Sequence, residues 1–161
     1  MLKTINDFEF VSIWNTDNKE LKKQLFTFWL EHDLMLKEEA VKRVDQAVVI
    51  IKCNGKIVGV STVFKTYFKK LAANVYAYRC FIEKAYRAPA LSTRLTIETK
   101  RILATALSES DKPVGLLAVI QNQKIKQYWN KAVWPDVDLV YIGNAANGDH
   151  FRISYFENSK I

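Results

Sequence analysis

The chain has 161 residues, with 24 Lys and Arg against 17 Asp and Glu, which gives a formal net charge of +7. Apolar residues make up 49% of the chain and charged residues 25%, which excludes the charge-rich, aromatic-poor composition of disordered proteins. A domain of this length buries enough surface to fold without a metal or disulfide staple. We therefore expect one globular domain over residues 1–161 and no metal site.

Two sequence features indicate the cellular compartment. Cys53 and Cys80 are too few for the disulfide framework of a secreted protein, and they lack the spacing of a zinc site. Acidic residues interrupt the N-terminal segment where a signal peptide carries an apolar run, and no apolar run approaches the roughly 20 residues of a membrane span. We expect a cytoplasmic protein that does not enter the membrane.

The excess positive charge lies in the middle of the chain. Between Lys65 and Arg101 there are nine basic and two acidic residues, and the remaining sequence balances at 15 of each sign. The basic residues are Lys65, Lys69, Lys70, Arg79, Lys84, Arg87, Arg94, Lys100 and Arg101. Such a stretch is typical of a site for a polyanion, which includes nucleic acid, phospholipid and polyphosphate cofactors. A solvated basic face without a ligand is the alternative.

The first third of the chain predicts a strand and two helices. Residues 8–14 form a short β-type run. Asn18 or Asp17 is a candidate cap for a helix whose apolar residues follow the spacing i, i+4, i+7, i+8. These apolar residues are Leu21, Leu25, Phe28 and Trp29. A second helix is predicted over residues 36–44, with an apolar side formed by Ala40, Val41 and Val44.

Two runs rich in β-branched residues flank Asn54-Gly55. They cover residues 47–53 and 57–64, and an Asn-Gly pair between such runs is a strong signal for a β-hairpin. After a basic loop, residues 74–82 alternate in pattern and predict a further strand.

The second half of the chain predicts two helices and three strands. The longest helical stretch runs from Leu91 to Leu107, and a shorter one runs from Asn122 to Val133. Strands are predicted over residues 116–120, 139–142 and 151–155, with Asn147-Gly148 in the turn between the last two.

The predicted element order is β-α-α-β-β-β-α-β-α-β-β. An antiparallel meander followed by strand-helix-strand units indicates an α/β protein of the α+β kind. We expect one mixed, mostly antiparallel central sheet that is flanked by four helices. The third and fourth helices serve as crossovers.

Residues 82–95 join a predicted strand to the longest helix. The first N–H groups of a helix are unpaired and the helix dipole is positive there, so this junction predicts an anion site. Ala88, Ala90 and Ser92 are small enough to let a diphosphate approach the backbone closely. Arg87 and Arg94 add positive charge on either side.

This loop and the element order resemble the GCN5-related N-acetyltransferase (GNAT) superfamily. Its members often carry Tyr-Arg-Gly-x-Gly-x-Gly-x-x-Leu, and here residues 86–95 read Tyr-Arg-Ala-Pro-Ala-Leu-Ser-Thr-Arg-Leu. Arg87 matches the arginine of the motif, while Ala90 and Ser92 replace glycines. The resemblance implies an acyl-CoA N-acyltransferase fold with acetyl-CoA, or another acyl-CoA, as cosubstrate. The residues that it implies for binding are Ile82, Arg87, Ala88, Ala90, Leu91, Ser92, Thr93, Arg94 and Asn122.

A second stretch carries the same resemblance. GNAT members follow their fifth strand with Asn-x-x-Ala-x-x-x-Tyr-x-x-x-Gly-Phe, in which the Asn contacts the pantetheine arm and the Tyr protonates the departing thiolate. Asn122 and Trp134 lie in register with the Asn and the closing aromatic residue. Trp129 occupies the tyrosine position and Tyr128 precedes it, so the resemblance implies Tyr128 as the general acid.

The resemblance also implies an oxyanion site. Backbone N–H groups of the fourth strand polarise the thioester carbonyl in the family, and the corresponding residues are Phe81 and Ile82. Where the family uses a catalytic glutamate in this strand, the present chain has Tyr76, which is not an effective base near neutral pH.

The end of the first helix borders the acceptor cleft in the family, so the resemblance implies a cleft at the same place in this chain. Glu31, His32 and Asp33 are the candidate bases there, and histidine is the residue type that changes charge near neutral pH. Tyr76 and Tyr78 share one face of their strand, which gives the cleft an aromatic wall.

We therefore expect an acetyl-CoA-dependent N-acyltransferase that transfers an acetyl group to an amine by direct attack in a ternary complex. One alternative is an inactive GNAT-like module that binds nucleic acid or a protein. Its support is Lys65, Lys69 and Lys70, which interleave with Tyr67 and Phe68 as in nucleic-acid-binding surfaces. A further alternative is a GNAT-like enzyme that modifies nucleic acid, as phage DNA-modification enzymes of the Mom type do. Exposed sheet edges of this architecture often pair, so a homodimer is a further expectation.

Overall fold

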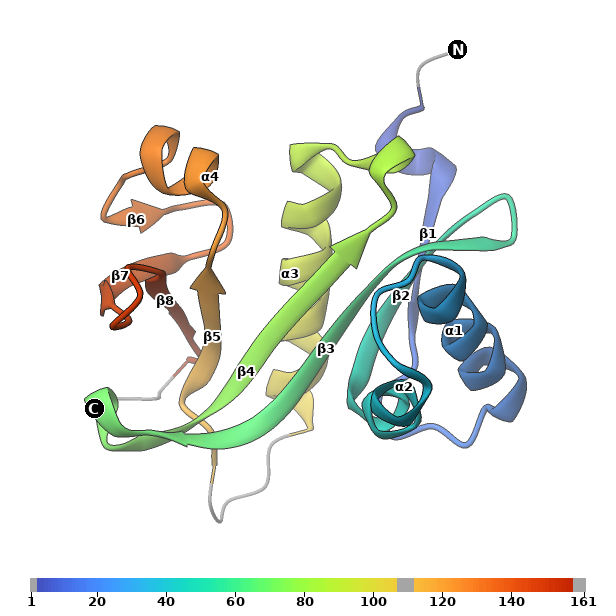
Figure 1. Ribbon diagram of the computed structural model, residues 1–161, viewed down its shortest axis with the longest axis horizontal. Helices are drawn as coiled ribbons and strands as arrows, with labels where there is room; N and C mark the ends of the chain where they lie inside the picture. Colours follow the sequence, from blue (N-terminus) through green and yellow to red (C-terminus); the bar gives the residue numbers. More distant parts are fainter. Residues whose placement is uncertain (1–2, 107–111, 158–161) are drawn as a thin grey trace. The chain divides into compact units, whose positions relative to one another are not determined.

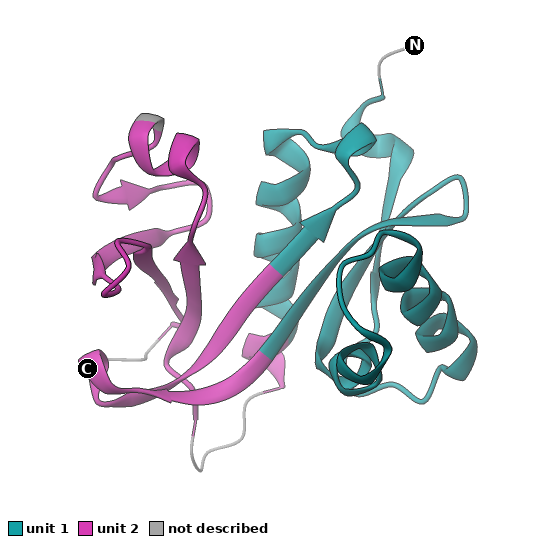
Figure 2. Ribbon diagram, in the orientation of Figure 1, with its two compact units in different colours: residues 1–63, 80–102 teal, residues 64–79, 103–161 magenta. Residues whose placement is uncertain are grey.

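The computed structural model (Figure 1) describes residues 3–106 and 112–157 of the chain. The chain divides into two compact units, which Figure 2 colours separately. Unit 1 comprises residues 1–63 and 80–102, and unit 2 comprises residues 64–79 and 103–161.

The described residues form eight strands, four α-helices and four short 3₁₀ helices. The strands are β1 (Phe8–Ser12), β2 (Ala47–Cys53), β3 (Lys56–Phe68), β4 (Ala73–Ile82), β5 (Gly115–Ile120), β6 (Val133–Trp134), β7 (Leu139–Asn144) and β8 (His150–Tyr155). The α-helices are α1 (Lys19–Glu31), α2 (Lys37–Arg43), α3 (Pro89–Thr105) and α4 (Gln123–Tyr128). The 3₁₀ helices are η1 (Ile5–Asp7), η2 (Val44–Gln46), η3 (Lys69–Leu71) and η4 (Lys84–Tyr86).

Hydrogen bonds place the strands in the order β1-β2-β3-β4-β5-β8-β7-β6. β4 and β5 pair in parallel, and α3 is the crossover that a parallel pair requires. The other pairs with a defined register are antiparallel. The predicted α+β architecture, with one mixed and mostly antiparallel sheet and four helices, is confirmed over the described residues.

In unit 1, α1 forms where the sequence predicts it, because both its cap and its apolar stripe are present. The side chain of Asn18 accepts a hydrogen bond from the N–H of Leu21 at 3.0 Å, which satisfies one open donor of the first turn. The stripe is buried and consists of Leu21, Leu25, Phe28 and Trp29. Each large side chain contributes about 1.5–3 kcal/mol on burial, so the stripe stabilises the helix more than its cap does.

α1 and α2 cover one face of the unit 1 sheet, and α3 covers the other (Figure 1). Neighbouring residues of β3 point to opposite faces of the sheet. Val60 belongs to the buried cluster that includes the α1 stripe, whereas the Oγ of Ser61 lies 2.6 Å from the Oγ1 of Thr99 in α3. The end of β4 follows the same rule, because the ring of Phe81 packs 5.8 Å from the ring of Phe28 in α1.

The β2–β3 hairpin turns at Asn54 and Gly55, whose φ angles are 52° and 76°. Two successive residues with positive φ are typical of the tight hairpin turn that an Asn-Gly pair predicts, so this prediction is confirmed. β3 continues to Phe68, beyond its predicted end at Phe64. The expected loop over these residues was wrong, because Thr66, Tyr67 and Phe68 are strong strand formers.

Unit 2 is built on β5, β7 and β8. β5 and β8 pair along their full length, from Gly115 opposite Tyr155 to Ile120 opposite His150. The buried cluster of this unit consists of Val75, Leu117 and Ile153. A Cβ added at Gly115 would overlap the carbonyl oxygen of Ser154, so glycine lets the two strands approach closely at this end.

The prediction of a helix over residues 122–133 was wrong at its C-terminal end. α4 ends at Tyr128, and the N–H of Trp129 caps it by donating to the carbonyl of Ile125 at 2.9 Å. Side chains help to hold the segment that follows. The guanidinium of Arg152 donates to the carbonyl of Lys131 at 2.6 Å, and the indole N–H of Trp134 donates to the carbonyl of Trp129 at 2.8 Å. The segment then pairs with β7 as the short strand β6.

The predicted helix over residues 91–107 is α3, which begins at Pro89, earlier than expected. Leu107 lies outside the described residues. Within the described ranges, no helix is both long and apolar enough to span a membrane, and no three His, Cys, Asp or Glu side chains gather where they could hold a metal ion.

Candidate active site

In unit 1, α3 begins at an exposed loop that follows β4. Proline is tolerated at the first helical position because the N–H group there has no helical partner. Ala88, Pro89 and Ala90 are exposed, and the carbonyl of Ala88 accepts hydrogen bonds from Leu91 and Ser92 at 3.1 and 3.3 Å. The start of α3 therefore presents small side chains and the positive end of a long helix to solvent.

Two arginines flank this helix start, and each is positioned by a contact within unit 1. The Nε of Arg87 donates to the carbonyl of Ile82 at 2.8 Å, and its guanidinium lies 5.5 Å from the centre of the Phe81 ring. The Nε of Arg94 lies 3.1 Å from a carboxylate oxygen of Glu98. The side chain of Arg94 is nevertheless 55% exposed, so its charge still faces solvent.

The other predicted binding residues of this segment are less exposed. Leu91 is 2% exposed and its N–H already donates to the carbonyl of Ala88, so neither its side chain nor this N–H is open to a ligand. The hydroxyl of Ser92 donates to the carbonyl of Pro89 at 3.1 Å, and Thr93 is half-buried.

Phe81 and Ile82 end β4, and their side chains point to opposite faces of the sheet. Phe81 faces α1, while Ile82 is buried with its Cγ1 beside Gly59 of β3. The N–H of Glu83 donates to the carbonyl of Val58 at 2.8 Å, so pairing with β3 extends just past the strand. This hydrogen bond fixes the backbone next to the two predicted oxyanion residues.

His32 follows α1 as its C-terminal cap and lies next to the end of β4. Its Nε2 is 3.8 Å from the Oε2 of Glu83. Its ring packs edge-on against Phe28, with ring centroids 4.7 Å apart, and its centroid is 5.8 Å from that of Phe81. The side chains of His32 and Glu83 are 25% and 20% exposed, so the pair sits in a partly closed site.

Glu31 is exposed and does not share this site. It lines an open groove of about 380 Å³ between α1 and the β2–β3 hairpin, together with Lys23, Thr27, Phe28 and Lys56. The structure therefore brings His32, and not Glu31, to the end of β4.

Tyr76 and Tyr78 belong to unit 2, whereas Glu31 and His32 belong to unit 1. The ring of Tyr76 packs edge-on against Phe156 with ring centroids 6.3 Å apart. Burial raises the pKa of the Tyr76 phenol above its ordinary value of 10.0, because the charged phenolate loses hydration there.

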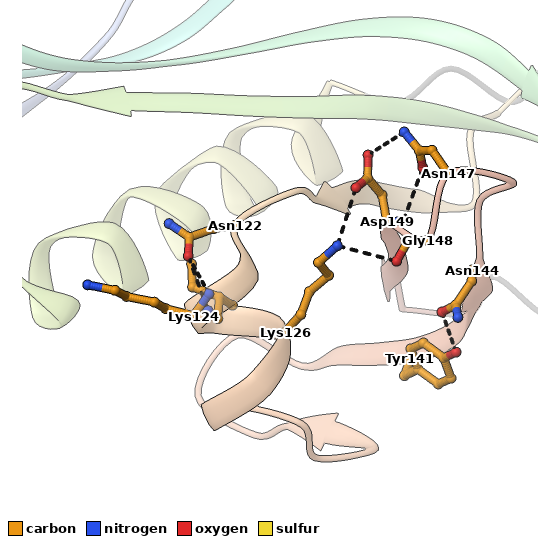
Figure 3. A network of polar contacts seen from close by, with 9 residues as sticks. Asn122, Lys124, Lys126, Tyr141, Asn144, Asn147, Gly148 and Asp149 are labelled. Atoms are coloured by element: carbon orange, nitrogen blue, oxygen red, sulfur yellow. Dashed lines mark hydrogen bonds and ion pairs between the residues drawn. The ribbon is translucent and has the colours of Figure 1, made fainter.

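Asn122 and Tyr128 mark the two ends of α4 in unit 2. The Oδ1 of Asn122 accepts hydrogen bonds from the N–H groups of Lys124 and Ile125 at 2.9 and 3.2 Å, which makes it the cap of the helix (Figure 3). Asn122 is the residue predicted to contact pantetheine, and its side-chain oxygen is used in this capping role. Tyr128 is the last residue of α4, and its side chain lies outside the described part of the structure.

Figure 3 also shows how α4 is tied to the turn between β7 and β8. The Nζ of Lys126 lies 3.4 Å from the carbonyl oxygen of Gly148 and 3.5 Å from the Oδ1 of Asp149. The other carboxylate oxygen of Asp149 accepts a hydrogen bond from Asn147 at 3.0 Å. Lys126 and Asp149 are only 10% and 14% exposed, so this ion pair fixes the helix to the sheet of unit 2.

No protein-family model matches the sequence, and no curated protein matches it. Solved structures do match the fold. A GNAT-family acetyltransferase from Streptococcus pneumoniae superimposes with a TM-score of 0.53 at 17% identity, over 91% of this chain and 96% of that chain. The ribosomal-protein-S5-alanine acetyltransferase from Vibrio fischeri gives a TM-score of 0.60 at 14% identity, over 96% of each chain. The chain has the GNAT fold.

A third structure with the GNAT fold contains a ligand. It is N-acetylglutamate synthase from Neisseria gonorrhoeae in complex with coenzyme A and N-acetyl-glutamate, with a TM-score of 0.51 and 11% identity over 94% of this chain and 35% of that chain. The resemblance that the loop and the element order predict is therefore confirmed at the level of the fold.

Within this GNAT fold, the basic and aromatic stretch over residues 65–70, at the end of β3 and in η3, is only partly available to a ligand. Lys70 is exposed, but its Nζ donates to the carbonyl of Asn144 at 2.8 Å and lies 5.3 Å from the Phe151 ring. Phe68 packs on the same ring at 5.0 Å. The other exposed members of the stretch are Lys65, Tyr67 and Lys69.

Glu83 is the residue of this GNAT-fold site that sequence reasoning misses. It follows β4 in an otherwise basic loop, and the sequence pattern gives no reason to single out one carboxylate there. Its proximity to His32 arises from the packing of α1 on the sheet, between residues far apart in the sequence.

Proposed function

We propose that the chain is an N-acyltransferase that takes an acetyl group from acetyl-CoA and transfers it to an amine by direct attack in a ternary complex. The observation that carries the proposal is the junction of β4 and α3. There, a long helix begins among exposed small residues between Arg87 and Arg94, in a chain with the GNAT fold.

The chemical requirements of the pyrophosphate support this assignment. An anion of this kind is bound by open backbone N–H groups, the positive end of a helix and guanidinium groups. The exposed residues Ala88, Pro89 and Ala90 leave the backbone accessible, and Ala88 and Ala90 are the two of them that carry an N–H, because proline has none. Arg87 and Arg94 supply the charge. The coenzyme A in the structure from Neisseria gonorrhoeae supports an acyl-CoA as the cosubstrate.

The remaining roles are those that the resemblance to GNAT sequences implies for the end of β4 and for α4. The backbone N–H groups of Phe81 and Ile82 polarise the thioester carbonyl and stabilise the oxyanion that forms on attack. Asn122 contacts the pantetheine arm in addition to capping α4, and Tyr128 protonates the thiolate that leaves. The product is an N-acetylated amine and free coenzyme A.

A thermal-shift titration with acetyl-CoA tests the proposal. Binding to the folded state raises its stability by about 2.7 kcal/mol at a hundredfold excess over the dissociation constant. Ala90→Asp places a negative charge at the start of α3 and abolishes this gain. Ala146→Asp, in an exposed turn of unit 2, adds the same charge elsewhere and keeps the gain. No rise in melting temperature at millimolar acetyl-CoA would contradict the proposal.

Nucleic-acid binding is a second candidate function, favoured by the exposed Lys65, Tyr67 and Lys69. A phosphate-binding surface predicts an affinity for a mixed-sequence oligonucleotide that falls steeply as salt is raised. The double variant Lys65→Gln/Lys69→Gln weakens such binding. Affinity that does not change with salt, or with this variant, would rule the candidate out.

A further inference from the structure

We propose that His32 is the general base of the acyl transfer and that Glu83 positions its ring and stabilises its protonated form. This inference rests on the proposed function and assigns the base that the family's strand position, occupied here by Tyr76, does not provide. Both residues lie in unit 1, beside the backbone groups proposed to hold the oxyanion.

The carboxylate of Glu83 supplies the first observation. Its Oε2 is buried and has no hydrogen-bond partner within residues 3–106 and 112–157. A buried carboxylate oxygen without a donor is costly, and it stabilises any cation placed beside it. The Nε2 of His32, at 3.8 Å, is the nitrogen in that place. Protonation of His32 thus completes an ion pair for which the acceptor is already in position.

The setting of the His32 ring supplies the second observation. Phe28 and Phe81 pack against it, which restrains the ring, and one quarter of the side chain stays exposed. A base needs this combination, because the ring has to hold one orientation and still exchange its proton with solvent. We assign the proton of the neutral imidazole to Nε2, which faces Glu83 at 3.8 Å, so that Nδ1 is the acceptor.

The charges around the ring favour this role for His32. Glu83 faces it from the end of β4, and the guanidinium of Arg87 lies across the ring of Phe81. Glu31 and Asp33, which precede and follow His32 in the chain, are exposed. The carboxylate of Glu83, 3.8 Å from Nε2, is therefore the charge that directly faces the imidazole.

The proposed step conserves atoms and charge. The acceptor arrives as an ammonium ion and gives one proton to Nδ1 of His32, and the freed lone pair attacks the thioester carbon. A C–N bond forms and the C–S bond breaks. Tyr128, the acid of the proposed function, gives its proton to the departing thiolate and recovers one from the amide nitrogen. The proton on His32 then passes to solvent, so that the reaction yields amide, coenzyme A thiol and one proton.

The first test measures the His32–Glu83 coupling without any substrate. The chain has two histidines, so the ring signals of His32 and His150 can be followed by NMR and assigned with His32→Asn. We expect Glu83→Gln to shift the ring signals of His32 and to leave those of His150 unchanged, because the carboxylate that lies 3.8 Å from Nε2 is lost.

Two further variants make this result specific. Glu83→Asp keeps the charge and gives an intermediate shift, and it replaces Glu83→Gln if that variant does not fold. Asp45→Asn removes an exposed carboxylate from the same unit and leaves the His32 ring signals unchanged. Unchanged His32 signals in both Glu83 variants would overturn the coupling.

The second test measures how much the base contributes to kcat. It uses two probe amines at saturating acetyl-CoA. At neutral pH 2-phenylethylamine is protonated and needs a base, whereas hydroxylamine is already unprotonated. We expect His32→Asn to lower kcat about a hundredfold with 2-phenylethylamine, the scale of general-base catalysis, and by less than about threefold with hydroxylamine. Glu83→Gln shows the same selectivity to a smaller extent.

The outcomes separate the two proposals. Equal losses with both amines would show that His32 acts only in folding or binding, which overturns its role as the base. Turnover of neither amine by the wild-type chain, together with no acetyl-CoA thermal shift, would contradict the proposed function itself. The NMR result is independent of turnover and decides the coupling in either case.

Discussion

The hydroxyl groups of Ser61 and Thr99 lie 2.6 Å apart in the buried interior of unit 1 and join β3 to α3. The hydroxyl of Thr99 also bonds to the carbonyl of Leu95 at 2.7 Å, and the Ser61 oxygen accepts from the N–H of Val49 at 3.2 Å. The four groups form a continuous series in which Val49 donates to Ser61, Ser61 to Thr99, and Thr99 to Leu95. Val49 lies at a bulge in the β2–β3 pairing, so the side chain of Ser61 replaces a ladder acceptor.

Ser61→Ala is expected to destabilise the chain by about 2 kcal/mol, because it leaves the N–H of Val49 buried without an acceptor. Thr99→Val keeps the shape of the side chain and costs less, about 1 kcal/mol. The double variant should cost about 1 kcal/mol less than the sum, since the two hydroxyl groups depend on each other. Urea unfolding of the four proteins measures this cycle, and strict additivity would show that the contact does not couple β3 to α3.

Gly115→Ala is expected to destabilise unit 2 by about 3 kcal/mol or more, because the new methyl group meets the backbone of Ser154 and no flexible side chain can yield. Gly59→Ala is the matched control. Its nearest contact is the side chain of Ile51 at 3.0 Å, which can shift, so the loss should be smaller. Thermal melts compare the two variants, and equal losses would contradict the close approach of β5 and β8.

Arg87→Gln is expected to weaken acetyl-CoA binding about tenfold, the effect of losing one charged hydrogen bond of roughly 1.5 kcal/mol. The substitution should change melting temperature little, because Arg87 is exposed. Lys37→Gln removes one positive charge from the exposed start of α2 and serves as the control. Isothermal titration calorimetry provides the comparison, and equal affinities of all three proteins would exclude Arg87 from the site.

The raised pKa of Tyr76 makes a prediction about alkaline unfolding. A phenol whose pKa is higher in the folded state than in the unfolded state holds its proton more tightly when folded. Its contribution to stability is complete below the unfolded pKa, near 10, and is lost as pH rises through the folded pKa. Urea midpoints between pH 8 and 11 should therefore fall less steeply for Tyr76→Phe than for wild type. Parallel slopes would show that Tyr76 titrates alike in both states.

The sequence predicts well those elements whose conformation is determined by residues close to one another in the chain. α1 has a capping Asn18 and a stripe of four apolar residues, and the β2–β3 hairpin has an Asn-Gly turn, so each carries its own signal. The predicted helix extended beyond the end of α4 because the residues after Tyr128 have helical composition. Their conformation is set by the guanidinium of Arg152, which comes from β8 and binds the backbone of the segment. A contact of this kind leaves no local pattern in the sequence.

The residues of the candidate site also differ in how well the sequence predicts them. The loop residues around Arg87 could be predicted because a strand, a basic turn and a helix follow each other in the chain. His32 was one of several candidate bases at the end of α1, and the sequence could not separate it from Glu31. The distinction comes from Glu83 and Phe81, which the fold of unit 1 brings to His32 and not to Glu31.

Where glycine is usual in GNAT sequences, the loop that leads into the first turn of α3 carries Ala88, Ala90 and Ser92. Glycine loses more conformational entropy on ordering than other residues, and its replacement at a compatible position stabilises a chain by about 0.4–1 kcal/mol. Folding alone therefore fixes more of the shape of this loop than it would fix in a glycine-rich one. An anion that binds at the start of α3 meets a preorganised backbone, and its association should carry a smaller entropic penalty.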